Sequence, residues 1–313
     1  MLTKDEIFDV DPSFKHLESF VDRISECQKF TSTAELHPRE RNNNFLAFYG
    51  STGVGKSWLM HRLHFECKKR KLAVGRLKLE NDRLNDPVRI MIDIVEQIGE
   101  NKFETWAKVK QRWNSIFGSE IDQSSNSTMN VANERDVNIQ GDAVAGNKYQ
   151  ISGDIQTPAQ RNPEDYKNTL TQNFLKDLSE LLQREPVVFL LDNLDNENLA
   201  PRTREWILEN LLDKPRTAKG YGVLAAITSN QELNSSIYFD ILESDTENDE
   251  ILPLEREHVI EYMRVRKITE YIIEKEIDAF VKRTQGVPKK VFEEITLILK
   301  AIKRLTSPST GIS

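Results

Sequence analysis

Three short runs of largely apolar residues, and a fourth segment in which apolar residues are mixed with Gly, Arg and Lys, stand out against the polar background of this chain. Each run is followed by a glycine, by acidic residues or by small polar residues. Apolar runs of this length, without alternation, are typical of strands that are buried on both faces of a parallel sheet. The sequence therefore predicts strands over residues 45–49, 73–79, 186–191 and 221–227.

Between and after these runs, apolar residues recur at the spacing of amphipathic helices. Strands and helices alternate as far as the fourth strand, and only helices follow it, which predicts an α/β core with a C-terminal helical lid. We expect a parallel sheet with helices on both faces over residues 1–252, and the lid over residues 253–313. The predicted helices cover residues 15–30, 56–71, 88–98, 103–117, 164–184, 202–212, 255–267, 270–284 and 288–305.

One segment interrupts this alternation. From about residue 118 to residue 163 the chain is rich in Ser, Asn, Gly, Asp and Gln, and Gly-Asp or Gly-Asn pairs recur. The short pieces between these pairs predict a small β-rich insert of short strands and tight turns, with disorder over residues 123–133. Because such strands leave unpaired edges, we interpret the insert as an oligomerisation or partner-docking element, or else as a disordered surface insertion.

The most specific signal lies between the first strand and the helix that follows it. The pattern G-x-x-x-x-G-K-[ST] is filled at every position by Gly50-Ser51-Thr52-Gly53-Val54-Gly55-Lys56-Ser57. Glycines let backbone N–H groups converge on phosphate oxygens, and the helix N-terminus adds positive potential. We therefore expect this P-loop and the adjacent Trp58 to bind a nucleoside triphosphate, with Lys56 at the β- and γ-phosphates and Ser57 at Mg²⁺.

Acidic and small polar residues follow the third and fourth strands. Asp192 ends the third strand, where a P-loop protein needs a carboxylate to hold Mg²⁺. Asp195 is expected to orient or deprotonate the attacking water, although its sequence context also fits a simple turn. Thr228, Ser229 and Asn230 either sense the γ-phosphate or merely end the fourth strand. The predicted catalytic residues are Lys56, Asp192 and Asp195, and the predicted metal ligands are Ser57 and Asp192.

Composition excludes several classes of protein. The chain has 313 residues, of which 38% are hydrophobic, and it has no run of 18 apolar residues, so we expect no membrane span. Its two cysteines are too few for a disulfide framework, which indicates a reducing, cytoplasmic setting. The net charge of −7 argues against a generally basic nucleic-acid-binding protein. Eight Lys and Arg residues between positions 61 and 83 either contact nucleic acid or an acidic neighbour, or form a solvated face.

Together these motifs resemble the STAND class of signal-transduction P-loop ATPases, which are relatives of the AAA+ proteins. The resemblance covers roughly residues 18–305, and besides the P-loop it rests on residues 190–195, which are similar to the Walker B segment of NACHT-like members. Residues 20–26 are similar to the N-terminal h-x-G-R-x-x-E motif, which implies that Arg23 lies near the adenine. Residues 286–288 resemble the G-x-P motif of the lid, which implies that Pro288 contacts the base.

Two departures from the family pattern affect the predicted site. Asp22 stands where glycine is usual, which puts the role of Arg23 in question. Asn230 stands where many members have an arginine that contacts the γ-phosphate. Lys289 or Lys290, directly after the G-x-P motif, either replaces that cation or is solvated at the start of a helix.

The resemblance implies an ATP- and Mg²⁺-dependent switch ATPase, which forms a homo-oligomer or controls an effector protein, in the setting of bacterial antiviral defence. No Ser/His/Asp or Cys/His constellation stands out in the sequence, so the effector is expected on a separate subunit. Two alternatives stay open. One is a DNA-associated AAA+-like regulator, which the basic residues at 61–83 favour. The other is an ATP-binding adaptor that does not hydrolyse, which the departures at Asp22 and Asn230 favour.

Overall fold

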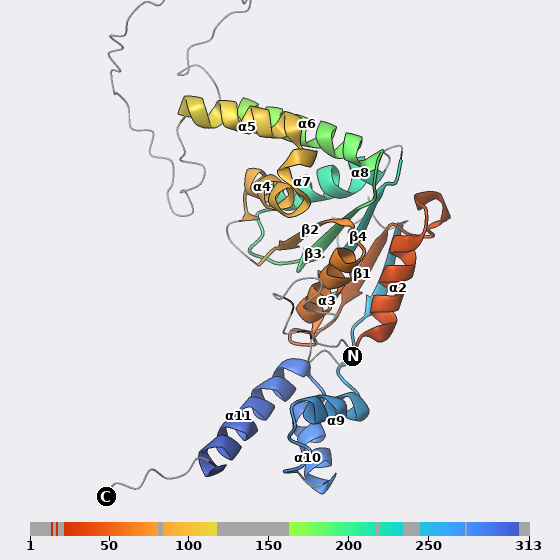
Figure 1. The fold of residues 1–313 in the computed structure, drawn as a ribbon, viewed down its shortest axis with the longest axis vertical. Coiled ribbons are helices and arrows are strands. Elements are labelled where there is room, and N and C mark those ends of the chain that lie inside the picture. The colour runs from red at the N-terminus through yellow and green to blue at the C-terminus, as the bar shows by residue number, and fades with distance from the viewer. Residues whose placement is uncertain are drawn as a thin grey trace, which may run out of the picture.

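The centre of the molecule is a five-stranded parallel sheet with the strand order β2-β3-β4-β1-β5 (Figure 1). The computed structural model describes residues 14, 17, 22–80, 84–117, 163–216, 220–233, 245–272 and 274–306. The strands are β1 (Phe45–Tyr49), β2 (Ala73–Lys78), β3 (Val187–Asp192), β4 (Val223–Ser229) and β5 (Thr246–Glu250). The first four match the predicted strands to within two residues, so the α/β fold class is confirmed.

Helices cover both faces of this sheet (Figure 1). One face carries α2 (Ile24–Glu35) and α3 (Lys56–Lys69). The other carries α4 (Pro87–Ile98), α5 (Glu104–Phe117), α6 (Pro163–Leu182) and α7 (Pro201–Ile207). The short turns η2 (Pro38–Glu40) and η4 (Glu100–Lys102) are 3₁₀-helices. The single helix predicted over residues 202–212 is instead α7 followed by the π-helix η7 (Leu208–Asp213) and then α8 (Lys214–Arg216).

The helix predicted over residues 15–30 is described only in part, because residues 15–21, apart from Leu17, lie outside the described residues. Over the described residues α2 runs from Ile24 to Glu35, five residues beyond the predicted end. It begins at Ile24 because Arg23 has a left-handed backbone conformation, with φ 72°, which an α-helix does not contain. It ends at Glu35 because Leu36 is already extended, one residue before His37 and Pro38.

Alternate residues of the central strands pack on opposite sides of the sheet. Phe45 and Ala47 of β1 belong to the hydrophobic cluster under α4, α6 and α7, whereas Leu46 and Phe48 belong to the cluster under α2 and α3. β3 and β4 alternate between the two clusters in the same way. Both faces of the sheet are therefore buried at β1, β3 and β4, and this is the reason that these three strands appear in the sequence as continuous apolar runs.

β5 is the strand that the sequence did not predict. Its five residues include three acids and no apolar side chain, so the hydrophobic pattern carries no signal for it. It pairs in parallel with β1 at the edge of the sheet. Lys29 of α2 forms ion pairs with Glu247 (2.7 Å) and Asp249 (2.5 Å). At an edge, backbone pairing and charged side chains suffice, because one side of the strand has no neighbour to exclude water.

The C-terminal helices pack into a hydrophobic cluster of their own. They are α9 (Arg256–Val265), α10 (Glu274–Thr284) and α11 (Pro288–Thr306), close to the three predicted lid helices. Val259, Phe280 and Ile295 are among the residues at the centre of this cluster. Figure 1 shows the three helices grouped at one end of the molecule, next to the start of α2 and the loop before α3.

Two sequence predictions concern parts of the chain that are only partly described. The Gly-Asp-rich insert predicted over residues 118–163 lies outside the described residues, apart from Pro163, where α6 begins. The first residues of the N-terminal motif, Phe20 and Val21, also lie outside them. Within the part that is described, no helix has both the length and the apolar character needed to cross a membrane.

The connection between β5 and the lid passes Gly286 at very short range. Leu254 donates a backbone hydrogen bond to the carbonyl oxygen of Gly286 (2.8 Å). Gly286 has φ 66°, and a Cβ atom on it would overlap the carbonyl oxygen of Leu254. Gly222 offers a matched comparison, since its φ is 64° but a Cβ there would meet only Pro38, at an ordinary 3.6 Å.

We expect Gly286→Ala to lower the free energy of unfolding clearly more than Gly222→Ala does. Both substitutions place alanine in a left-handed conformation, which costs about 1–2 kcal/mol. Only Gly286→Ala also forces the Leu254 carbonyl to move. Urea denaturation of the two variants measures the difference, and equal losses would show that the close approach to Leu254 has no energetic weight.

Candidate nucleotide-binding site

The P-loop connects β1 to α3 at the carboxyl edge of the sheet. Gly53 (φ 88°) and Gly55 (φ 104°) adopt left-handed conformations that residues with a side chain rarely take. A Cβ atom on Gly50 would lie 2.7 Å from the carbonyl oxygen of Ile251. α3 begins at Lys56, so the loop leads directly into a helix N-terminus. The backbone geometry therefore requires the glycines of the motif and presents N–H groups as an anion site does.

Lys56 is buried within this loop, with 8% of the residue exposed. Its ammonium group donates hydrogen bonds to the carbonyl oxygens of Gly50 (2.6 Å) and Ser51 (3.2 Å) and to Oδ1 of Asn230 (3.1 Å). Burial lowers the pKa of Lys56, while three nearby carboxylates act in the opposite direction. A buried cation held by neutral oxygens is well suited to exchange them for phosphate oxygens.

Asp192 ends β3 and is 1% exposed. Its Oδ1 accepts hydrogen bonds from the hydroxyl groups of Ser57 (3.2 Å) and Thr228 (2.8 Å). Its Oδ2 is buried without a hydrogen-bond partner and lies 3.6 Å from a guanidinium nitrogen of Arg76. Burial lowers the pKa of Arg76, and the nearby Asp192 opposes that effect.

The donor set around Asp192 fits Mg²⁺. A buried carboxylate oxygen that accepts no hydrogen bond and an adjacent serine hydroxyl are hard oxygen ligands, which this cation prefers. Among the described residues, His, Cys, Asp and Glu do not group in threes or more in a way that could hold a metal ion. The residues described here would therefore share the cation with water and phosphate oxygens, as is usual for Mg²⁺.

A chain of polar contacts joins the ends of β3 and β4. The backbone N–H of Asn193 donates to the Thr228 hydroxyl (2.8 Å), and the Asn193 amide oxygen accepts from the Asn230 amide (3.4 Å). The backbone N–H of Asn230 donates to Oδ2 of Asp195 (2.7 Å). The other carboxylate oxygen of Asp195 is buried without a hydrogen-bond partner. Asp195 is thus tied to the end of β4.

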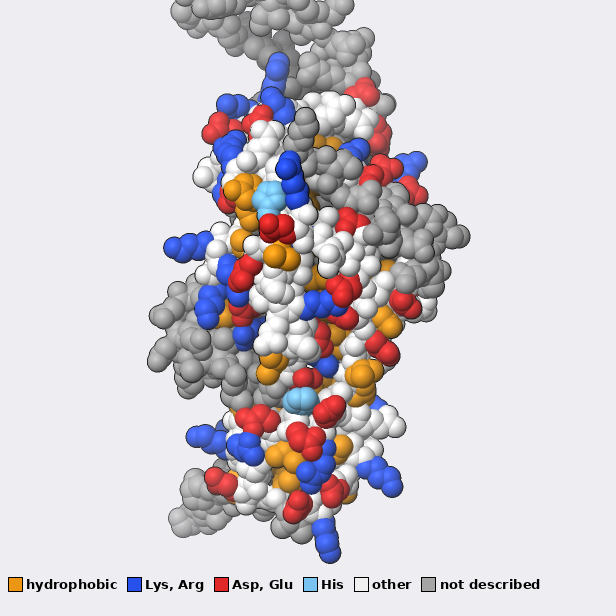
Figure 2. Space-filling model, turned by 90° about the vertical axis from the view of Figure 1, so that its right-hand side faces the viewer, with side chains coloured by type: hydrophobic (Ala, Val, Ile, Leu, Met, Phe, Trp, Pro, Cys, Tyr) orange, Lys and Arg blue, Asp and Glu red, His pale blue; other side chains and the backbone are white. Residues whose placement is uncertain are grey.

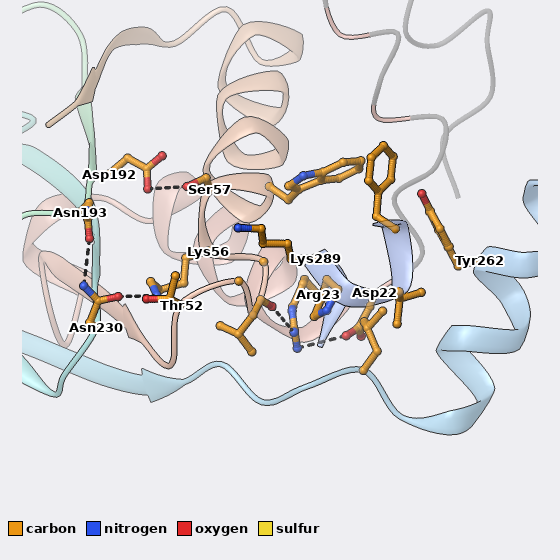
Figure 3. Close-up of a pocket in the computed structure, with 18 of the residues that line it drawn as sticks. Asp22, Arg23, Thr52, Lys56, Ser57, Asp192, Asn193, Asn230, Tyr262 and Lys289 are labelled. Carbon is orange, nitrogen blue, oxygen red and sulfur yellow. Dashed lines mark hydrogen bonds and ion pairs between the residues drawn. The ribbon is translucent and has the colours of Figure 1, made fainter. Parts of the chain in front are cut away.

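Many of the groups described above line a cavity of about 600 Å³ between the core and the lid (Figure 3). From the lid, Tyr262, Lys289 and Phe292 line it. Gly50, Ser51 and Asp195 are not among its lining residues. The predicted site residues that do line it are Arg23, Thr52, Gly53, Val54, Gly55, Lys56, Ser57, Trp58, Asp192, Asn230 and Pro288.

Sequence reasoning missed six residues of this cavity, of which two are polar, two are aromatic and two, Leu254 and Val291, are aliphatic. Glu80 and Asn193 lie just beyond the ends of β2 and β3, and the parallel order of the strands was the signal that could have placed them at this edge. Tyr262 and Phe292 carried no such signal, because an aromatic residue in an amphipathic helix is also typical of a core. The hydroxyl of Tyr262 is buried without a hydrogen-bond partner. Aromatic side chains at this end of the cavity suit a planar ligand such as a nucleobase.

Arg23 fastens the P-loop to the start of the lid connection. Its guanidinium group donates to the carbonyl oxygens of Val54 (3.0 Å) and Leu252, and forms an ion pair with Asp22 (3.1 Å). Asp22 also lies 3.6 Å from Nε2 of His258 in α9. The aspartate that departs from the family pattern is therefore the partner of Arg23, and both side chains lie at the cavity (Figure 3).

Lys289 brings the lid into direct contact with the P-loop. Its backbone N–H donates to the carbonyl oxygen of Gly53 (3.2 Å), and its Cβ would lie 3.2 Å from a Cβ placed on Gly53. Pro288 lies beside Gly55 in the same way, since a Cβ placed on Gly55 would lie 3.6 Å from Cγ of Pro288. Of the two lysines that the sequence offered as a phosphate-directed cation, Lys289 lines the cavity, and Lys290 is not among the lining residues.

The predicted basic cluster is largely engaged within the molecule. Arg62 and Arg70 both form ion pairs with Glu66, and Arg76 pairs with the carboxylate at the end of β3. Figure 2 shows positive and negative side chains interspersed over the face that it presents. Arg83, the last residue of the cluster, lies outside the described residues. These ion pairs favour a structural role for the cluster over a nucleic-acid-binding surface.

Of three comparisons with known proteins, only the one with solved structures finds similar chains. A scan against protein-family models gives no match, and a search of curated proteins gives none. The chain is similar to Cdc6p from Pyrobaculum aerophilum (13% identity, TM-score 0.42), covering 83% of this chain and 51% of that one. It is also similar to PCH-2 from C. elegans, with 12% identity and a TM-score of 0.48, and the match covers 95% of this chain and 67% of that one. A third similar structure is that of the E. coli MS115-1 HORMA:CdnC:Trip13 complex, with 11% identity and a TM-score of 0.43, and the match covers 100% of this chain and 85% of that one.

The chain spans about half the length of the Cdc6p chain. At these scores its fold class rests on its own features, which are the parallel order β2-β3-β4-β1-β5, the P-loop after the central β1 and the C-terminal helices. The intact P-loop between β1 and α3 has the backbone geometry of a phosphate-binding site.

We expect Arg23→Met to lower the free energy of unfolding by about 1–3 kcal/mol, because it leaves buried carbonyl groups and Asp22 without their partner. Arg39→Met is the matched control, since Arg39 is exposed on η2. Chemical denaturation of both variants measures the effect. An Arg23→Met protein as stable as the Arg39→Met protein would rule out this fastening role.

Proposed function

We propose that this chain is an Mg²⁺-dependent ATPase switch of the STAND type. The observation that carries the proposal is the meeting of three elements at one cavity. The P-loop brings Lys56 and Ser57, the end of β3 brings Asp192 beside Ser57, and the lid closes the opposite side with Pro288 and Lys289. A phosphate-binding loop, a metal-binding carboxylate and a movable cover are the parts that a nucleotide-driven switch needs.

In this proposal each residue has a defined task. Lys56 turns its ammonium group from the loop carbonyls to the β- and γ-phosphates. Ser57 and Asp192 hold Mg²⁺, which neutralises phosphate charge when it is bound. Tyr262 and Phe292 of the lid, with Trp58, provide aromatic surface for the base. Arg23 holds the P-loop beside the start of the lid connection through its bonds to Val54 and Leu252, and acts as a positioning residue.

The lid is the element through which nucleotide binding would be transmitted. Its contacts with the P-loop side include the bond from the Lys289 N–H to Gly53 and the approach of His258 to Asp22, the residue that pairs with Arg23. A nucleotide that touches both walls of the cavity adds contacts only when the lid is docked, and therefore shifts the population toward that state. We infer that the docked state favours a homo-oligomer or engages a separate effector protein, and the defence setting rests on the motif resemblance alone.

One alternative keeps a specific observation in its favour. A non-hydrolysing ATP-binding adaptor fits the position of Asp195, the expected base, because this carboxylate is tied to Asn230 and does not line the cavity. The DNA-associated alternative is less well supported, since the arginines that favoured it form ion pairs within the chain.

We expect Lys56→Ala to weaken Mg·ATP binding by about tenfold or more, because charge-assisted hydrogen bonds of about 1.5–3 kcal/mol are lost. Lys69→Ala, at the exposed end of the same helix, is the control and should bind like the unmodified protein. Titration calorimetry measures the binding. Equal affinity of the two variants would remove the P-loop from the proposed site.

We also expect a larger particle with Mg·ATP than with Mg·ADP or without nucleotide, and no such growth in Lys56→Ala. Light scattering coupled to size-exclusion chromatography measures the mass in each condition. An unchanged mass in all conditions would contradict nucleotide-driven self-assembly and leave control of a separate protein as the output.

A further inference from the structure

Glu80 is a carboxylate at the wall of this cavity, just beyond the end of β2. β2 and β3 pair in parallel with Lys78 opposite Asp192, and the backbone N–H of Leu79 donates to the carbonyl oxygen of Asp192 (3.0 Å). The pairing thus continues past the formal end of β2. It places Glu80 at the carboxyl edge of the sheet, among the residues that line the cavity with Lys56 and Asp192.

The side chain of Asn193 orients this carboxylate. Asn193 follows Asp192 in a left-handed conformation, with φ 71°, which asparagine tolerates well. Its amide nitrogen donates to Oε1 of Glu80 (3.4 Å), while its amide oxygen accepts from Asn230 (3.4 Å). An amide cannot take up a proton at neutral pH, so Asn193 serves as a link between two strand ends.

The other carboxylates of the cavity are already engaged. Of the described residues that line it, three carry a carboxylate, namely Asp22, Glu80 and Asp192. Asp22 pairs with Arg23 at the lid end, and Asp192 receives the hydroxyl groups of Ser57 and Thr228. Glu80 has a side chain that is 49% exposed, with Lys78 at 3.5 Å from Oε2. It is therefore open to water and able to pass a proton to solvent.

Asp195 is placed differently. Its Oδ2 is held by the backbone N–H of Asn230, its Oδ1 is buried without a partner, and the residue is not part of the cavity lining. Asn230 itself reaches the cavity and bonds to Lys56. This geometry makes Asp195 a support for Asn230, since it contacts the residue that contacts the site.

We propose that Glu80 is the general base for ATP hydrolysis and that Asp195 is a positioning residue. This proposal rests on the proposed ATPase function. In the step, the oxygen of a water molecule forms a bond to the γ-phosphorus while the water proton passes to a Glu80 oxygen. The bond from the γ-phosphorus to the bridging oxygen breaks, and its electron pair stays with ADP. Glu80 then releases the proton to solvent, and phosphate leaves.

The test compares Glu80→Gln, Asp195→Asn and Glu197→Gln, the last being an exposed residue of the loop after β3 that serves as control. Each variant is mixed with Mg·ATP at protein excess over several hours, and the bound nucleotide is identified by chromatography. Nucleotide affinity is measured separately with a non-hydrolysable ATP analogue. The long incubation at protein excess allows even slow hydrolysis by the isolated chain to be seen.

We expect Glu80→Gln to retain affinity within about threefold but to hydrolyse at least about 100-fold more slowly, so that ATP stays bound. Asp195→Asn should lose less than about tenfold, because an amide oxygen still accepts the Asn230 N–H. Glu197→Gln should be unchanged. In Glu80→Ala, added formate should restore part of the rate by supplying a small carboxylate in the vacated space, which a purely structural role of Glu80 would not explain.

Two other outcomes would overturn the assignment in distinguishable ways. If Glu80→Gln hydrolyses as the unmodified protein does while Asp195→Asn is inactive, the base is Asp195 and the ATPase function stands. If the unmodified protein binds ATP and never converts it, the chain is not an ATPase. Both the proposed hydrolysis and the role of Glu80 as its base are then wrong.

Discussion

The hydroxyl groups of Ser57 and Thr228 meet on one oxygen of the buried Asp192, and the other parts of the site are arranged around this contact. Ser57 belongs to α3, Thr228 to β4 and Asp192 to β3, so a single carboxylate connects three elements that are far apart in the sequence. The parallel register fixes their positions, since Leu191 lies opposite Ile227 in adjacent strands. Because strand ends of a parallel sheet share one edge, every polar residue just beyond a strand becomes a neighbour of this contact.

The sequence predicted most of the core because burial on both faces leaves a plain signal. Three strands appeared as largely apolar runs, β2 appeared as a more mixed segment, and the P-loop glycines could be assigned from the backbone conformations that phosphate binding requires. β5 gave no such signal. It is an edge strand whose side chains are largely charged, and its place depends on backbone pairing with β1 and on Lys29, which lies 218 residues before Glu247. A contact over that separation has no trace in local periodicity.

The limits of prediction within the site have the same origin. Residues of a contiguous motif, from Gly50 to Ser57, were identified as a unit, although only six of them line the cavity. Glu80 and Asn193 are single polar residues after strands, and their importance depends on which strands are adjacent. Arg23 was placed near the ligand by its motif, but its contacts with two backbone carbonyl groups could be known only after the chain was folded.

Several contacts around the junction between the core and the lid end on main-chain oxygens. The oxygens of Val54 and Leu252 accept from Arg23, the oxygen of Gly53 accepts from the Lys289 N–H, and Leu254 pairs with Gly286 through backbone groups alone. Every residue type supplies a backbone oxygen, so Val54 and Leu252 can be replaced by other residues without loss of the bonds that Arg23 makes to them. The junction is therefore tolerant of substitution on its accepting side, while the requirement for a particular residue is concentrated on the donor Arg23 and on the glycine at position 286.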